Sequence, residues 1–281
     1  MLSQPNDLAE VDFLGLSIKC LVSGALLLIL LIVSPATVAA DLGETVTCYL
    51  LTEPVTIDGA WTSKTEWNDA EEVKMLVGDG NADGYFRVKF DDNWLYVLAE
   101  SLINTSVEYN SAKGFGDYYS VFLDTAHNHG KSPSTDDYRF YANWRSTGNT
   151  ELKLGKGNGT GWDWSSTPPE GTQVSIGLDT GNSPHTPHPH VVGEFRLPLS
   201  IIQIGTFGFF IRFGDSTEAL NMHFYWPGPT MANQAIDPSS WGNVSINNNP
   251  IPEFSSVWLI MLTMVTVVLV IFRRNRRRQT A

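Results

Sequence analysis

The fold is decided by Tyr85-Phe86-Arg87-Val88-Lys89-Phe90, followed after three residues by Trp94-Leu95-Tyr96-Val97-Leu98-Ala99. In the first run Phe86, Val88 and Phe90 alternate with other residues and share one face of an extended chain, as in a strand with one buried side. The second run is almost wholly apolar and contains the aromatic and β-branched residues that strands favour. Both runs therefore predict β-strands.

Comparable runs recur along the chain, separated by clusters of Gly, Asn, Asp and Pro. They are Tyr119–Leu123, Glu194–Leu197 and Phe207–Phe213. Short strands with turn signals between them are typical of a β-sandwich, and about 200 residues are enough for one such domain. We therefore predict an all-β protein in which residues 41–246 form one antiparallel β-sandwich, with layers of the immunoglobulin-like or jelly-roll type.

Little of this domain is predicted to be helical. Helical periodicity is confined to short stretches at Trp67–Val73 and Leu199–Ile202. Residues 125–137 and 155–190 are polar and are predicted to be loops. Because loops on a rigid scaffold often carry binding residues, we expect function there.

Residues 1–40 are predicted to be a secretory signal peptide. An apolar run that ends in small residues, Val38-Ala39-Ala40, follows the positive charge of Lys19. Removal of this segment takes Cys20 with it and leaves Cys48 as the one cysteine of the mature chain, which excludes a disulfide framework. Cys48 is expected to pack as a small apolar residue in the first strand.

The C-terminal end has the three parts of a membrane-directed tail. A linker over residues 247–254 contains Pro252-Glu253-Phe254, and an uncharged apolar helix is predicted over residues 255–272. That helix lies at the short end of the roughly 17–25 residues that a transmembrane span needs. The basic tail, residues 273–281, is expected in the cytoplasm by the positive-inside rule, so the domain is expected on the extracellular side.

The order of tripeptide, short apolar helix and basic cluster resembles the PEF-CTERM sorting signals of archaeal surface proteins. The resemblance implies that a membrane-embedded archaeosortase cuts near Pro252-Glu253-Phe254 and transfers the protein to a lipid anchor. A permanent membrane anchor is the alternative, and it leaves the domain on the same side of the cell membrane. Three sequons, at Asn104, Asn158 and Asn243, suit a glycosylated exterior.

The charge of the chain restricts its partners. Its net charge is −12, and the basic tail contributes much of the positive charge, so the domain itself is more acidic still. Such a surface argues against nucleic acid as a partner and suits bound cations or a saline habitat.

A series of landmarks runs through the predicted sandwich. In order they are Ile57-Asp58-Gly59 with Trp67, Leu95-Tyr96-Val97, Asp117 before Leu123-Asp124, Glu194-Phe195-Arg196-Leu197-Pro198, and Trp226-Pro227 with Trp241-Gly242. This order resembles the family 9 carbohydrate-binding modules and their wider, DOMON-like superfamily. The resemblance implies a β-sandwich. For the ligand it allows a sugar, haem in an electron-transfer subunit, or neither, since fold does not settle function.

Sugar binding needs exposed aromatic rings that stack on the C–H faces of pyranose rings. The candidates are Trp144, Trp162 and Trp164, of which the last two lie in a polar stretch where packing alone gives a tryptophan little reason to be. A packing role at the edge of the core is the alternative. The other tryptophans of the domain are expected to be structural: Trp61, Trp67, Trp94, Trp226 and Trp241.

Asp79, Asn81 and Asp83 match the first half of a calcium-binding loop, in which carboxylates at alternate positions converge on one Ca²⁺ ion. The glutamate that would complete an EF-hand is missing, because Phe90 stands in its place. Ca²⁺ is therefore a candidate ion, and a turn-rich β-hairpin loop is the alternative.

Transition metals and haem are weaker candidates. His185-Thr186-Pro187-His188-Pro189-His190 offers three imidazoles to a metal, but alternating His and Pro is also an ordinary solvated loop. Haem is not favoured, because the chain has no Cys-x-x-Cys-His attachment motif. Met75, Met222 and His223 are more simply explained as core and surface residues.

The sequence contains no nucleophile elbow, zincin helix or phosphate loop, and acid pairs such as Asp136-Asp137 are expected in so acidic a chain. We therefore predict a protein that is not an enzyme and that binds a polysaccharide or cell-envelope glycan outside the cell. One alternative is a cell-envelope structural or adhesion protein without a sugar ligand, and another is a haem-binding electron-transfer module.

Overall fold

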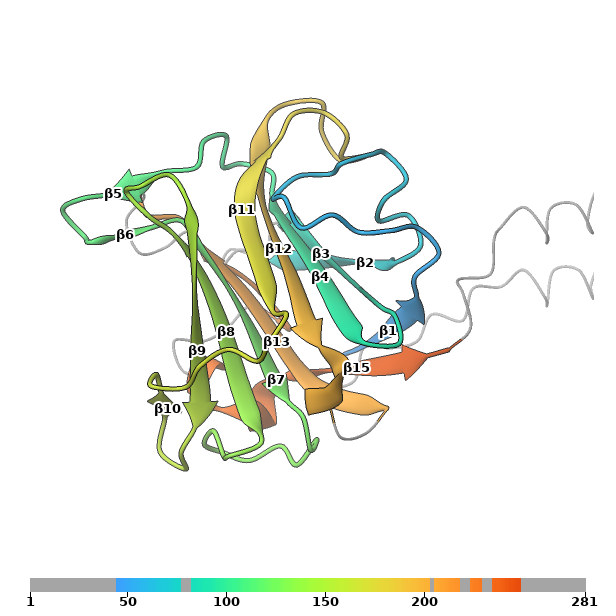
Figure 1. The fold of residues 1–281 in the computed structure, drawn as a ribbon, viewed down its shortest axis with the longest axis vertical. Helices are drawn as coiled ribbons and strands as arrows, with labels where there is room; N and C mark the ends of the chain where they lie inside the picture. The colour runs from blue at the N-terminus through green and yellow to red at the C-terminus, as the bar shows by residue number, and fades with distance from the viewer. Residues whose placement is uncertain (1–43, 77–81, 203–204, 218–222, 229–233, 249–281) are drawn as a thin grey trace, which may run out of the picture. The chain divides into compact units, whose positions relative to one another are not determined.

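The computed structural model describes residues 44–76, 82–202, 205–217, 223–228 and 234–248. These residues form a β-sandwich, which confirms the predicted fold class (Figure 1). The predicted signal peptide, sorting tripeptide, transmembrane helix and basic tail lie outside them. Among the described residues, no helix is long and apolar enough to cross a membrane.

Two layers of antiparallel strands make up the sandwich (Figure 1). The first has the order β10-β9-β8-β7-β13 and consists of β7 (Tyr118–Asp124), β8 (Asp137–Trp144), β9 (Thr150–Gly157), β10 (Trp162–Asp163) and β13 (Thr206–Gly214). The second has the order β2-β3-β4-β12-β11 and consists of β2 (Glu71–Leu76), β3 (Ala82–Phe90), β4 (Trp94–Ser101), β11 (Gln173–Asp179) and β12 (His190–Pro198).

Three further strands join the two layers: β1 (Thr45–Leu50), β14 (His223–Trp226) and β15 (Gly242–Asn247). β14 pairs with β13 and also with β2, and β15 pairs with β13. β1 pairs with β15 and β3, and both of these pairings are parallel. The sheet is therefore mixed, because β1 adds parallel pairing to the predicted antiparallel sandwich. β1 and β15 lie at opposite ends of the domain sequence, so no hairpin signal could reveal their register.

Short elements lie outside the layers. They are the hairpin of β5 (Tyr109–Asn110) and β6 (Phe115–Gly116), and the 3-10 helices η1 (Leu199–Ile201), η2 (Gln234–Ile236) and η3 (Pro238–Ser240).

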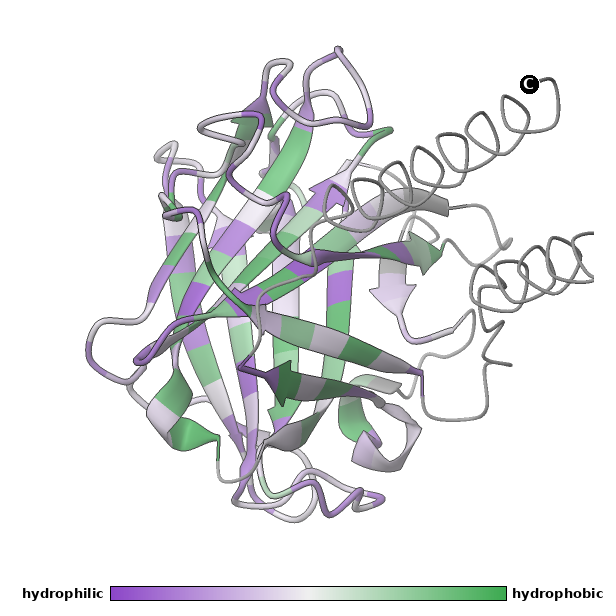
Figure 2. Cartoon of the chain, turned by 90° about the vertical axis from the view of Figure 1, so that its right-hand side faces the viewer, coloured by the Kyte–Doolittle hydropathy of each residue, from purple (hydrophilic) through white to green (hydrophobic). Residues whose placement is uncertain are grey.

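The apolar face of β3 lies in the main core, as its alternation indicated. Phe86, Val88 and Phe90 are buried, and the Phe86 ring packs against Phe209 of the other layer with ring centroids 5.6 Å apart. Figure 2 shows green apolar residues interrupted by polar ones along the strands. Cys48 is buried in β1 within the same core, which confirms its predicted role, and burial raises the pKa of its thiol.

The opposite face of β3 is also covered, although it carries charged residues. The fully buried Lys89 ammonium donates hydrogen bonds to the backbone oxygens of Glu53, at 3.0 Å, and Glu66. It also pairs with the Asp69 carboxylate at 2.7 Å. Burial lowers the pKa of Lys89, and the interaction with Asp69 opposes that effect. The polar side of this strand therefore holds the segment that precedes β2.

Three of the sequence landmarks meet at the buried Glu194 carboxylate in β12. Its Oε2 accepts hydrogen bonds from the backbone N–H groups of Asp58 (2.9 Å) and Gly59 (2.8 Å), and its Oε1 accepts one from Trp67 Nε1 (3.2 Å). Gly59 has a φ of +85°, and a Cβ on it would lie 2.5 Å from the backbone nitrogen of Gly177. Burial raises the pKa of Glu194 well above its usual range. These landmark residues therefore hold the fold together.

Two local predictions are wrong. Trp67–Val73 is not helical, because turns lead into β2 at Glu71 and this strand pairs with β3. Sheet pairing outweighs so short a periodic pattern. Residues 155–190 are not one loop, because the end of β9, β10 and the whole of β11 lie within them. β11 pairs with β12 over its full length although Ser175 and Gly177 weaken its apolar pattern.

Candidate functional site

A cavity of about 470 Å³ lies on the outer face of the first layer. It is lined by Phe115, Tyr118, Arg139, Tyr141, Lys153 and Trp164. These residues combine aromatic rings with two cationic groups. The volume falls within the roughly 300–1,000 Å³ that is typical of ligand pockets.

Strand register brings the lining residues together. In β8, Arg139 and Tyr141 flank the buried Phe140, so both side chains point away from the core. Tyr141 stands opposite Lys153 of β9 on one side and opposite Ser120 of β7 on the other. The short side chain of Ser120 leaves room between its larger neighbours.

Two glycines leave space for aromatic rings on this face. Gly214 of β13 stands opposite Tyr118, and a Cβ on it would lie 2.4 Å from Tyr118 Cζ, so a larger residue would displace the ring. Gly155 of β9 stands opposite Arg139, and a Cβ there would already be 3.4 Å from Trp164 Cζ3. The Trp164 ring therefore lies directly over the strand.

The Arg139 guanidinium is surrounded by aromatic rings. Its Cζ lies 4.9 Å from the centroid of Phe122, 5.3 Å from that of Tyr141 and 4.9 Å from that of Trp164. Its Nη2 donates to Ser120 Oγ at 3.3 Å. Within the described part of the chain, its Nε has no hydrogen-bond partner.

Burial governs the ionisation of the site. It lowers the pKa of Arg139 to about 10, and the nearby Arg212 charge acts in the same direction. Burial also raises the pKa of Tyr141 to about 12, which keeps this hydroxyl neutral and able to donate a hydrogen bond. At the rim, Lys153 Nζ lies 3.6 Å from a Glu151 carboxylate oxygen.

The two tryptophans of the polar stretch have different environments. Trp164 is 43% exposed, lines the cavity and meets the Tyr141 ring edge-on, with centroids 6.1 Å apart. Trp162 is half-buried, and its Nε1 donates to the Ala235 carbonyl at 3.0 Å. Its ring is parallel to that of Trp241, 6.4 Å away. Trp162 therefore has the packing role that the sequence left as the alternative.

The third candidate lies elsewhere. Trp144, at the end of β8, is half-buried against the main core and does not line this cavity. The residues of the cavity that sequence reasoning missed are Phe115, Tyr118, Arg139, Tyr141 and Lys153. One available signal was the alternation around Phe140, which places Arg139 and Tyr141 on the outward face.

Comparison with known proteins agrees with the fold. No family model and no curated protein matches the chain. Two similar solved structures are those of a family 9 carbohydrate-binding module from Caldicellulosiruptor kristjanssonii, one in complex with cellotriose and one with glucose. The first is 20% identical with a TM-score of 0.52, and the match covers 73% of this chain and 95% of that one. The second is 19% identical with a TM-score of 0.50, covering 74% and 99%. At this identity the likeness shows a shared fold.

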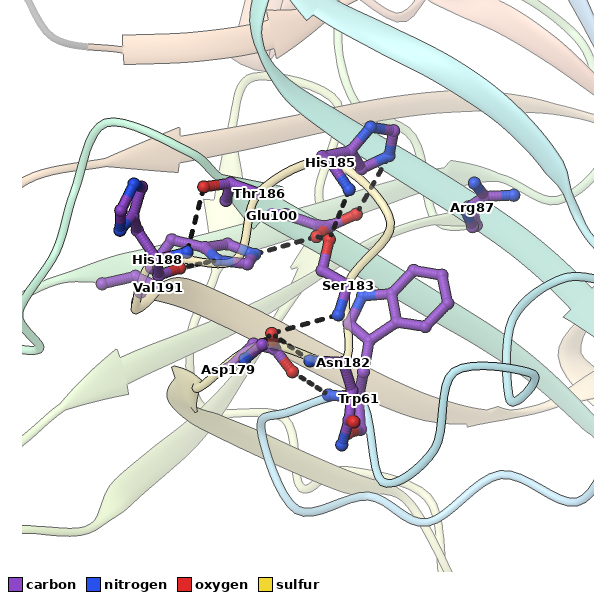
Figure 3. Close-up of polar contacts among 12 residues, drawn as sticks. Trp61, Arg87, Glu100, Asp179, Asn182, Ser183, His185, Thr186, His188 and Val191 are labelled. Carbon is purple, nitrogen blue, oxygen red and sulfur yellow. Dashed lines mark hydrogen bonds and ion pairs between the residues drawn. The ribbon is translucent and has the colours of Figure 1, made fainter.

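The predicted histidine segment belongs to a polar cluster on the second layer (Figure 3). The buried Glu100 carboxylate of β4 accepts hydrogen bonds from Ser183 Oγ at 2.7 Å and from His190 Nε2 at 2.9 Å. The other Glu100 oxygen lies 3.5 Å from His185 Nε2. The His185 ring stacks on Tyr85, with centroids 3.7 Å apart. The cluster ties the loop between β11 and β12 to the sheet.

The histidines of this cluster differ in their surroundings. Both ring nitrogens of His190 face acceptors, Glu100 and the backbone oxygen of His188. Burial acts to lower the pKa of His190, but these hydrogen bonds outweigh burial and raise it. The two hydrogen bonds therefore favour the protonated form of the His190 ring beside Glu100. The His188 side chain is exposed. This arrangement favours a structural role over a shared metal.

A group of three aspartates has the geometry to share a proton or a hard cation. The carboxylate oxygens of Asp124, Asp136 and Asp137 lie within 4.8 Å of one another. Asp137 Oδ2 accepts a hydrogen bond from Ser134 N at 2.6 Å, whereas its buried Oδ1 has no partner among the described residues. Burial, reinforced by the two neighbouring charges, raises the pKa of Asp137 to about 7.

The predicted calcium loop falls largely outside the described residues. Asp79 and Asn81 are not described, and of Asp83 only the backbone, in β3, is described. Calcium at this loop therefore stays a prediction.

The three sequons differ in accessibility. Asn158 is exposed, and Asn243 is half-buried and accepts a hydrogen bond from His127 Nε2 at 2.8 Å. Asn104 is buried, and its Nδ2 donates to Asp117 Oδ2 at 3.2 Å. Because a glycan is attached through Nδ2, Asn158 is the sequon best placed to carry one in the folded domain.

Proposed function

We propose that this protein binds carbohydrate without catalysis and that the cavity beside Trp164 is its sugar site. The observation that carries the proposal is the Trp164 indole, 43% exposed next to Tyr141 in a cavity of ligand size. Such a ring offers a flat apolar surface to a pyranose, while adjacent polar groups can bind hydroxyls. The similar modules, whose structures hold cellotriose and glucose, support this proposal.

On a glycan array, the full-length protein is expected to retain a defined set of glycans, and Trp164→Ala is expected to weaken their binding about tenfold. Loss of ring stacking and of buried aromatic area accounts for a change of this size. Leu178→Ala is the control, because Leu178 is an exposed apolar residue of β11 in the other layer and should leave binding unchanged. Retention of no glycan by the wild type, or unchanged binding by Trp164→Ala, would contradict the proposal.

We further propose that the domain is displayed on the extracellular side of the cell membrane through its C-terminal sorting tail. The order of the Pro252-Glu253-Phe254 tripeptide, the short apolar run and the arginine cluster supports this. An archaeosortase-like enzyme and the membrane are the partners that the tail implies.

Intact-mass analysis of protein isolated from its native cells is expected to show loss of the segment that follows Pro252-Glu253-Phe254. The cleaved segment carries the arginine cluster, so a discrete mass decrease distinguishes processing from a permanent anchor. Mature protein that still ends at Ala281 would defeat the processing step.

A further inference from the structure

The cavity is positively charged although the chain carries a net charge of −12. Arg139 and Lys153 are among its lining residues, and none of the described lining residues is acidic. The Arg212 charge acts on Arg139 from β13. The nearby Glu151 lies 3.4 Å from Arg145 as well as 3.6 Å from Lys153, so two cations already share its charge. The described lining of the site therefore has the opposite sign to the net charge of the protein.

The described part of the chain supplies no anion to Arg139. Among the described residues, no carboxylate lies within 4.0 Å of its guanidinium, and only Ser120 accepts a hydrogen bond from it. A desolvated cation is costly unless it is paired. The rings of Trp164 and Tyr141 stabilise the guanidinium by cation–π contact but leave its net charge unneutralised.

A planar guanidinium is well suited to a carboxylate, because two parallel N–H groups can bind both oxygens at once. Arg139 lines the cavity, and its terminal nitrogens donate to the described residues only through the Nη2 hydrogen bond to Ser120, so the terminal edge of the guanidinium is left for a ligand. A neutral sugar could occupy the same volume, but its hydroxyls would not neutralise the charge. The observations therefore favour an acidic ligand over a neutral one.

We propose that the cavity binds an acidic sugar, a hexuronate unit of a polysaccharide, with its carboxylate on Arg139 and a C–H face of its ring on Trp164. This inference rests on the proposed carbohydrate binding and names the class of sugar. Lys153 stands at the rim with its side chain half exposed and attracts further acidic units of the same chain.

The test is calorimetry of the full-length protein with hexuronate trisaccharides of several linkages, each paired with its carboxyl-reduced, neutral counterpart. The acidic member of at least one pair is expected to bind about tenfold more tightly or better, and its affinity alone should fall as salt is raised. Equal affinity within every pair, or preference for the neutral members, overturns the inference and leaves carbohydrate binding intact. Failure to bind any pair, by protein that retains neutral glycans on the array, also overturns it. An array that retains no glycan overturns both proposals.

Variants of Arg139 test whether its charge causes the preference for the acidic sugar. Arg139→Gln is expected to remove the preference for the acidic member, and Arg139→Lys to restore only part of it, because an ammonium keeps the charge but loses the planar fork. Lys131→Gln is the control, since Lys131 is exposed and lies outside the cavity lining. An unchanged preference in folded Arg139→Gln overturns the assignment. If that variant does not fold, the wild-type pairs and their salt dependence still decide the question.

Discussion

Replacing Glu194 with alanine is expected to lower the free energy of unfolding by roughly 3–6 kcal/mol, a large part of the stability of a typical domain. Three N–H groups, those of Asp58, Gly59 and the Trp67 indole, would lose their acceptor. Each buried donor left without a partner costs about 1–3 kcal/mol. Urea unfolding followed by tryptophan fluorescence measures the change.

A second variant, Glu194→Gln, separates the hydrogen bonds from the charge, and Glu170→Ala is the control. Glu194→Gln keeps one oxygen for the N–H groups of Asp58 and Gly59, but its amide would face Trp67 Nε1, which is also a donor. The loss of stability in Glu194→Gln should therefore lie between zero and the loss in Glu194→Ala. Glu170→Ala changes an exposed glutamate and should stay within about 0.5 kcal/mol of the wild type. Near wild-type stability in Glu194→Ala would show that these hydrogen bonds do not hold the segment before β2.

We expect the ionisation of Asp137 alone to lower the free energy of unfolding by roughly 2–4 kcal/mol as pH rises from about 4 to about 8 in the presence of a chelator. Burial and the charges of Asp124 and Asp136 raise the folded-state pKa from its usual value of 3.8 to about 7. The folded state therefore binds the proton more tightly than the unfolded state does. This contribution is fully present below the unfolded-state pKa and is lost as pH rises through about 7.

Asp137→Asn should flatten this part of the pH profile. An asparagine oxygen can still accept the hydrogen bond from Ser134 N, and its amide carries no charge to repel Asp124 and Asp136. The variant should thus be more stable than the wild type at pH 8 and approach it only near pH 4, close to the unfolded-state pKa. Asp92→Asn, at an exposed aspartate, is the control and should keep the wild-type slope. If stability of Asp137→Asn falls with pH as steeply as that of the wild type, Asp137 is not the titrating group. The chelator ensures that no cation takes the place of the proton among the three carboxylates.

The structure explains why the landmark residues predict a fold better than a ligand. Asp58, Gly59, Trp67 and Glu194 are joined by hydrogen bonds that attach one segment to the second layer. Gly242 likewise leaves space for the Trp226 ring, since a Cβ on it would lie 2.3 Å from that ring. None of these residues lines the cavity. A pattern carried by such residues specifies the sandwich and does not specify the side chains of its outer face.

The sequence by itself determined the all-β class, the buried face of β3 and the packing of Cys48, because alternation and apolar character are local properties that a strand displays directly. Only the tertiary structure decided which aromatic residues are available to a ligand. Trp162 and Trp164 stand two residues apart in one polar stretch, yet Trp162 packs on Trp241 while Trp164 remains exposed beside Arg139. Exposure depends on which distant segments cover a side chain. Likewise, the charge of Arg139 is unpaired among the described residues because no carboxylate among them reaches it.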